Sequence, residues 1–165
     1  MEFSPDGKLF ASVSIDDRME LWNLTSQPAT LLDKLESYDI RNIVAVKVSP
    51  DSKLLASGSS DGEVRLWDLT AANISRRLLQ GCYGVVLALA FSPDSQLLAS
   101  RSFKGVVRLL DSTAAETLCR LFRDLSITIW AMAFSLDGKL LASGSLDGEM
   151  RLWDLTAAEI FYRPL

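Results

Sequence analysis

The chain has 165 residues, which is the length of one domain, and its 48% apolar and 23% charged residues are typical of a globular protein with a buried core. It contains no histidine, which excludes Ser-His-Asp and Cys-His nucleophiles, His-ligated zinc and His-based pH switches. The formal net charge of -4 disfavours a nucleic-acid binder, which carries a basic surface for phosphate contacts.

The two cysteines, Cys82 and Cys119, are too far apart for a CxxC pair or a thiolate zinc site, and we expect them to be small buried apolar residues. The longest uncharged run, 78–93, is too short and too often interrupted for a membrane span. The first five residues show no signal peptide. We therefore expect an intracellular, cytoplasmic protein without metal or cofactor, with a nuclear location left open.

The chain is an internal repeat. A Ser-Pro-Asp turn preceded by an apolar residue recurs with spacings of 45, 43 and 43, beginning at Phe3, Val48, Phe91 and Phe134 (where Leu136 replaces the Pro). A second anchor 19 residues later has the same spacings, at Trp22, Trp67, Leu110 and Trp153. Fixed periods of this length are typical of repeat architectures such as propellers.

Within the second unit the predicted elements follow one another as short strands. Residues 44–48 alternate with a period of two and end at a Ser-Pro-Asp turn. Residues 54–59 form a second strand, which ends at the hairpin signal Asp61-Gly62. Residues 64–68 form a third, and the apolar stretch at 77–79 is a fourth. Four antiparallel strands per unit predict one propeller blade.

The predicted fold class is therefore all-β, with four four-stranded antiparallel blades in an open partial propeller. We expect one domain over 1–165, with blades at approximately 1–36, 37–80, 81–123 and 124–165.

The strings LLASGSSDGEVRLWD (54–68), LLASGSLDGEMRLWD (140–154) and FASVSIDDRMELWN (10–23) resemble blades of the WD-repeat family. The array is most similar to the WD-repeat tails of fungal and cyanobacterial NACHT-type, vegetative-incompatibility-like proteins. The resemblance implies a propeller and an interaction scaffold.

The resemblance also implies a structural hydrogen-bonded network in each blade, made by a Ser of the second strand, an Asp of the turn and a Trp of the third strand. The matching positions are Ser12, Asp16 and Trp22 in blade one, Ser57, Asp61 and Trp67 in blade two, and Ser143, Asp147 and Trp153 in blade four. The family's His partner is missing throughout. Blade three has Leu110 for the Trp and Arg101 where its neighbours have Gly, so we expect it to be the weakest blade.

Because strands alternate in direction, the starts of the innermost strands and the Asp-Gly-type turns lie at the same end of the blades. The predicted partner-binding residues at this end are Ile15, Phe103 and Leu146 at the turns, and Val44, Leu87 and Trp130 at the strand starts. Exposed apolar patches mark interaction sites. An alternative for the strand-start residues is that they belong to the core.

The predicted function is a noncatalytic protein-protein interaction scaffold of four WD repeats with an apolar face at the hairpin tips. The alternative is an incomplete fragment or remnant of a longer WD-repeat signalling protein with no independent activity. We expect no enzyme, because no nucleophile is accompanied by a base. The expected partner is a protein of unknown identity, and two chains are also expected to self-associate and complete a propeller.

Overall fold

A computed structural model describes residues 1–14, 18–35, 42–70, 74–79, 84–103, 105–113, 119–123, 129–145, 148–156 and 162–164. These residues form four sheets, each of four antiparallel strands that pair in chain order. The prediction of an all-β fold with four four-stranded antiparallel sheets is confirmed. We number the four sheets as blades one to four along the chain.

Each blade is an antiparallel meander of short strands. Blade one consists of β1 (Glu2–Phe3), β2 (Leu9–Val13), β3 (Met19–Asn23) and β4 (Thr30–Leu35). Blade two consists of β5 (Ile43–Val48), β6 (Leu54–Ser59), β7 (Val64–Asp68) and β8 (Ser75–Leu79). Blade three consists of β9 (Val86–Phe91), β10 (Leu97–Ser102), β11 (Val106–Asp111) and β12 (Cys119–Arg123). Blade four consists of β13 (Ile129–Phe134), β14 (Leu140–Ser145), β15 (Met150–Asp154) and β16 (Tyr162–Pro164).

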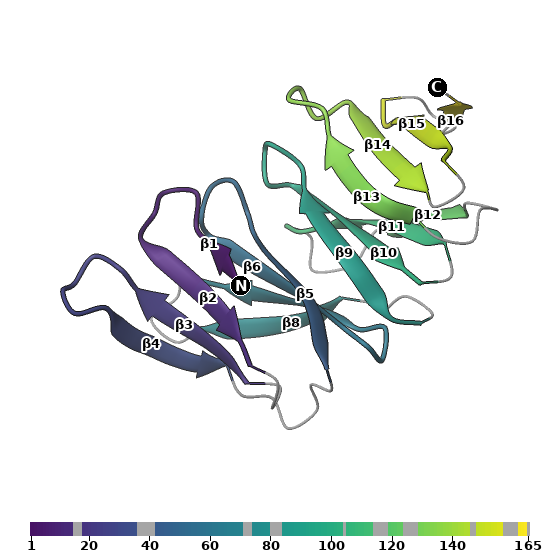
Figure 1. The fold of residues 1–165 in the computed structure, drawn as a ribbon. Helices are drawn as coiled ribbons and strands as arrows, with labels where there is room; N and C mark the ends of the chain where they lie inside the picture. Colours follow the sequence, from purple (N-terminus) through teal and green to yellow (C-terminus); the bar gives the residue numbers. More distant parts are fainter. Residues whose placement is uncertain are drawn as a thin grey trace.

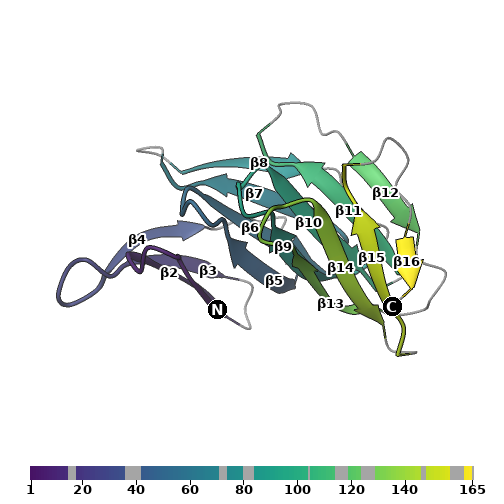
Figure 2. The same cartoon turned by 90° about the horizontal axis from the view of Figure 1, so that it is seen from above.

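The blades follow one another as a row. In Figures 1 and 2 the sheet β1–β4 lies at one end of the row and the sheet β13–β16 at the other. The first strands of the blades are neighbours, because β1 contacts β5, β5 contacts β9 and β9 contacts β13. This is the arrangement of strands around a propeller axis, and the row is an open partial propeller, as predicted.

The core is divided into three apolar clusters, one between each pair of adjacent blades. Between blades one and two, Met19 and Leu21 pack with Leu55 and Trp67. The equivalent residues of the later blades form the two other clusters. In each cluster one face of a blade, which we call its forward face, packs on the backward face of the next blade.

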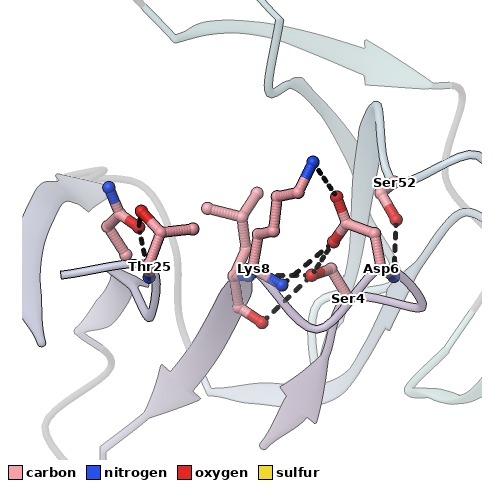
Figure 3. A network of polar contacts seen from close by, with 7 residues as sticks. Ser4, Asp6, Lys8, Thr25 and Ser52 are labelled. Atoms are coloured by element: carbon pink, nitrogen blue, oxygen red, sulfur yellow. Dashed lines mark hydrogen bonds and ion pairs between the residues drawn. The ribbon is translucent and has the colours of Figure 1, made fainter.

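The turn between the first and second strands of each blade is closed by the same serine and aspartate. In blade one the Ser4 hydroxyl donates to the Asp6 carboxylate (2.6 Å), which also accepts the Lys8 N–H (3.1 Å) (Figure 3). The Ser4 oxygen in turn accepts the Leu9 N–H (2.8 Å). The other three blades repeat these bonds from Ser49, Ser92 and Ser135. This network explains why Ser and Asp recur at the blade spacing.

These turns also connect neighbouring blades. The Asp6 N–H donates to the Ser52 hydroxyl (3.3 Å, Figure 3), and the Asp51 N–H donates to the Ser95 hydroxyl (3.2 Å). Ser52 and Ser95 adopt a positive φ of 61° and 63°, where the equivalent turns of the end blades carry glycine. A non-glycine residue at such a φ is strained, and the inter-blade hydrogen bond offsets part of that cost.

The same turns predict how stability depends on pH. The pKa of Asp6, Asp94 and Asp137 lies below the ordinary value of 3.8. The hydrogen bond from the Ser hydroxyl is the main cause, and the hydrogen bond from a backbone N–H is the second. Burial acts to raise the pKa of Asp51, but the hydrogen bonds from Ser49 and Lys53 outweigh it and the net shift is also downward. A carboxylate whose pKa is lower in the folded state stabilises the fold above its unfolded pKa, and this contribution is lost as the pH falls through the folded pKa.

We therefore expect the free energy of unfolding, measured by denaturant titration, to be level near neutral pH and to fall as the pH drops below 3.8. Asp94→Asn combined with Asp137→Asn should make this acid decline shallower, because two of the titrating carboxylates are removed. An unchanged decline in the double variant would show that other groups cause it.

Candidate functional site

Hairpin tips and innermost strands meet at one end of the blades. In blade two the Ser60 N–H, at the turn after β6, donates to the Asn42 carbonyl just before β5 (2.9 Å). In blade three the Phe103 N–H donates to the Val85 carbonyl in the same way (2.9 Å). We call this end of the molecule the tip end. The hydrogen bonds hold each turn against the start of its own innermost strand.

Each innermost strand of blades two to four begins with a β-bulge. Ile43 and Ala45 pair with consecutive residues of β6, so Val44 is the extra residue. By the same criterion Leu87 is the extra residue in β9, and Trp130 is the extra residue in β13. A bulge removes one residue from the ladder and redirects its side chain. The three residues predicted at the strand starts are therefore the bulged residues of their strands.

Two of the predicted contact residues are well exposed at the tip end. Phe103 is 58% exposed and Val44 is 45% exposed, so Val44 lies at the surface and not in the core. Leu87 is half-buried. Ile15, Leu146 and the side chain of Trp130 lie outside the described residues. We call Val44, Leu87 and Phe103 the tip surface.

A hollow adjoins the tip surface between the first strands of blades two and three. It has a volume of about 310 Å³ and includes Val44. Its other lining residues are Met1, Val13, Ile43, Ala45, Val46, Ala88 and Leu89. All of these side chains are apolar, so the hollow can take an apolar group.

The predicted Trp–Ser pairs are present in three blades. The indole Nε1 donates to the serine hydroxyl in Trp22–Ser12 (3.3 Å), Trp67–Ser57 (3.2 Å) and Trp153–Ser143 (3.0 Å). Each bond joins the second and third strands of a blade and satisfies a donor that lies among apolar residues.

The turn aspartate of blade two makes local contacts. Asp61 accepts hydrogen bonds from the Ser59 hydroxyl and from the Glu63 N–H (3.0 Å). Both donors belong to its own turn, so Asp61 stabilises the hairpin tip. Asp16 and Asp147, predicted to have the same role, lie outside the described residues.

Ser59 belongs to a series of turn residues that sequence reasoning missed. The hydroxyls of Ser14, Ser102 and Ser145 donate to the carbonyl oxygen four residues later, at 3.2, 3.4 and 3.1 Å respectively. The available signal was the recurrence of serine at positions 14, 59, 102 and 145, which have the spacing of the blades. These serines close the turns that carry Phe103 and its equivalents.

The three residues of the tip surface are apolar. Val44, Leu87 and Phe103 offer no nucleophile or titratable group. Within the described ranges no three His, Cys, Asp or Glu residues are grouped so that they could hold a metal ion. In the same part of the chain, no helix is long and apolar enough to cross a membrane.

Repeated four-stranded blades around an axis define the class of β-propeller repeat proteins. The family model "WD domain, G-beta repeat" matches residues 1–23, 31–68, 74–111 and 121–154. The chain belongs to the WD-repeat family, and the resemblance seen in its sequence is confirmed for the family.

Among solved structures the chain is similar to one from the "Crystal Structure of Mitotic Checkpoint Complex", with a TM-score of 0.79 and 23% sequence identity. The match covers 98% of this chain and 48% of that one, so the chain spans about half the length of its structural neighbour. At this identity the likeness shows the fold alone. A comparison with curated proteins found no match, and the similarity to tails of NACHT-type proteins stays a prediction.

Proposed function

We propose that this chain is a noncatalytic protein-interaction module whose partner binds at the tip surface. The observation that carries the proposal is the exposed Phe103, which a hydrogen bond of its own backbone holds beside the start of β9. Membership of the WD-repeat family supports an interaction role in general.

The physical argument starts from the cost of leaving a phenylalanine in water. An exposed aromatic ring at a hairpin tip adds nothing to the stability of the hairpin, whereas aromatic side chains are enriched at the centres of protein interfaces. The Phe103 turn is closed by the Ser102 hydroxyl and anchored by Val85, so little conformational entropy is lost when a partner covers the ring. The bulged Val44 and the apolar hollow next to it extend the same surface toward blade two.

The partner proposed here is a protein, because Val44, Leu87 and Phe103 are apolar side chains of the kind that protein interfaces bury. The proposed location is cytoplasmic, with the nucleus left open. We also propose three further contact residues from their positions in the repeat. Ile15 and Leu146 are equivalent to Phe103, and Trp130 is equivalent to Val44 and Leu87.

We expect Phe103→Ser to weaken partner binding by about 2 kcal/mol, the effect of losing an aromatic anchor. The thermal midpoint should change little because the ring is exposed in the free chain. Binding is measured by titration against the purified partner, and the midpoint by differential scanning calorimetry.

Two variants serve as controls for this prediction. Leu136→Ser removes a 97% exposed leucine from the opposite end of blade four and should leave both binding and the midpoint unchanged. Leu141→Ser removes a fully buried residue of β14 and should unfold blade four. If Phe103→Ser lowers the midpoint as Leu141→Ser does, the ring contributes to the core. Partner binding that survives Phe103→Ser and Val44→Ser would show that the partner binds elsewhere on the chain and would contradict the tip surface.

A further inference from the structure

The chain follows the same path after the third strand of blades two, three and four. Leu69, Ser112 and Leu155 stand at equivalent positions of the repeat, directly after the aspartate that ends each third strand. The N–H of each donates to the carbonyl of the residue just before the second strand of its own blade, at 2.8 Å in all three. The three side chains therefore start from the same place in their blades.

Two of these positions hold a leucine that packs against an interface between blades. Leu69 packs on the apolar cluster between blades one and two, and Leu155 packs on the cluster between blades three and four. Ser112 has no aliphatic group to offer, and its hydroxyl donates to the Ser95 carbonyl of its own blade (2.5 Å). The interface between blades two and three therefore has a serine where both neighbouring interfaces have a leucine.

A hollow of about 260 Å³ lies between blades two and three beside Ser112. Leu54 and Leu66 of blade two give it apolar walls, and its other described lining residues are Asp68, Ser75, Arg77, Ser112 and Thr113. Arg77 crosses the interface and donates to the Ser112 carbonyl. A cavity of roughly 150 Å³ with apolar walls takes up a small apolar molecule. The hollow is therefore large enough for the side chain of a leucine.

This hollow lies at the end of the blades opposite the tip end. Leu54 begins β6, Asp68 ends β7 and Ser75 begins β8, whereas the tip lies after the end of β6. Ser75 and Thr113 are exposed, so hydroxyl groups are present where the hollow meets solvent. A few placed polar groups beside apolar walls are typical of ligand pockets.

We propose that this hollow binds a leucine side chain from a partner polypeptide, in the place that Leu69 and Leu155 fill in the two neighbouring interfaces. The chain itself shows which occupant fits, because blade three repeats most of the lining around Leu155. The repeated residues, in the order of Leu54, Leu66, Asp68, Arg77 and Thr113, are Leu97, Leu109, Asp111, Arg120 and Thr156.

The polar groups of the lining favour a polypeptide over a purely apolar ligand. The Asp68 carboxylate and the Ser75 hydroxyl can accept hydrogen bonds from main-chain N–H groups while the leucine side chain contacts Leu54 and Leu66. A repeat that departs from its own pattern, and forgoes the packing of a leucine by doing so, departs from it most often at a functional site. This inference does not depend on the tip surface.

Titration of the isotope-labelled chain with N-acetyl-leucine methylamide, followed by NMR, tests the proposal. The probe has one leucine side chain and the main-chain groups that flank it. We expect saturable shifts of the Leu66, Ser112 and Thr113 amide signals. N-acetyl-glycine methylamide, which has the same main chain without the side chain, should give no saturable shift at these residues.

Two substitutions at Ser112 separate the hollow from the hydroxyl group. Ser112→Leu should weaken probe binding by about tenfold or more, because the new side chain fills the hollow. Its thermal midpoint should stay or rise, since leucine occupies this position in blades two and four and filling a hollow adds contacts. Ser112→Ala removes the hydroxyl and leaves the hollow open, so it should bind the probe as the wild type does.

Leu155→Ser provides a test that does not require any change at Ser112. It should open the equivalent hollow between blades three and four and add a second set of saturable shifts, at Leu109 and Thr156. Its β-sheet circular dichroism should match that of the wild type, because Leu155 is only half-buried. Absence of the second set in a folded Leu155→Ser chain would contradict the proposed match between the hollow and leucine.

The remaining outcomes distinguish this site from the tip surface. Phe103→Ser should leave probe binding at Ser112 unchanged, and Ser112→Leu should leave partner binding at the tip surface unchanged. Saturable shifts confined to Val44 and Phe103 would mean that the probe binds the tip surface, and would overturn the proposal. Wild-type chain without saturable shifts, or Ser112→Leu with shifts equal to those of the wild type, would show that the hollow is a packing gap.

Discussion

Replacing Trp67 by alanine is expected to lower the free energy of unfolding by about 3 to 5 kcal/mol. Trp67 is 3% exposed and belongs to the cluster that joins blades one and two. Its indole N–H donates to Ser57, so the substitution leaves a cavity between two blades and removes the donor that binds this hydroxyl. Equilibrium unfolding in urea measures the loss.

Trp22→Ala is the matched control. Trp22 makes the same hydrogen bond, to Ser12, but it lies on the open backward face of blade one and is half-buried. Both substitutions should be measured under the same conditions and at the same protein concentration. We expect a clearly smaller loss for Trp22→Ala. Equal losses would show that the Trp–Ser bond within a blade, and not packing between blades, supplies the stability.

The second large effect is expected at Gly58, where β6 approaches blade three. A Cβ at this position would lie 2.4 Å from Val86 Cγ1 and 2.8 Å from Val86 Cβ. Val86 is completely buried and its branched side chain cannot turn away without moving its neighbours. Gly58→Ala should therefore destabilise the fold by about 1 to 3 kcal/mol, the cost of overpacking a core.

Gly144 occupies the same position in blade four and is the control for Gly58. An added Cβ at this position meets no atom within 4 Å. Gly144→Ala should leave the free energy of unfolding unchanged or raise it by about 0.4 to 1 kcal/mol, because alanine restricts the unfolded chain. Chemical denaturation of both variants under one condition tests the difference. A loss at Gly144 as large as that at Gly58 would mean that backbone conformation, rather than the contact with Val86, requires the glycine.

The equivalent residue of blade three is Arg101, which the structure buries. Among the residues that the structure describes, its Nε and Nη1 atoms have no hydrogen-bond partner, and burial lowers the pKa of its guanidinium. Two buried donors without acceptors are costly. This cost adds to the argument from Leu110 that blade three is the weakest of the four, which stays a prediction.

The repeat made most of the fold predictable from the sequence. The Ser-Pro-Asp turn and the Trp or Leu of the third strand recur at one spacing, and the strand alternation between them leaves only an antiparallel meander for each unit. The Trp67–Ser57 pair was predictable from the resemblance to the WD-repeat family, which implies a hydrogen bond between these two positions. The aspartate of the turn was less predictable, since Asp61 has several possible donors nearby and bonds to those of its own turn.

Burial at the ends of the row could not be predicted from local sequence. Blades two and four are near-copies, yet Val64 is completely buried and Met150 is 51% exposed. Val64 is buried because it packs with residues of blade three, and no residue of blade two itself specifies that contact. The bulges at Val44, Leu87 and Trp130 were also not predicted. A bulge depends on how two strands are aligned with each other, and no residue type in these strands marks its position.

The most direct test of the proposed interaction role is site-specific photo-crosslinking from positions at opposite ends of the blades. A photoreactive phenylalanine analogue at position 103 should form a discrete crosslinked product with the partner protein. Excess unlabelled wild-type chain should abolish this product, and excess Phe103→Ser chain should not. The same analogue at position 136, on the opposite end of the blades, should form no such product. Equal crosslinking from both positions, or competition by the Phe103→Ser chain as strong as by the wild type, would contradict a binding surface at the tip end.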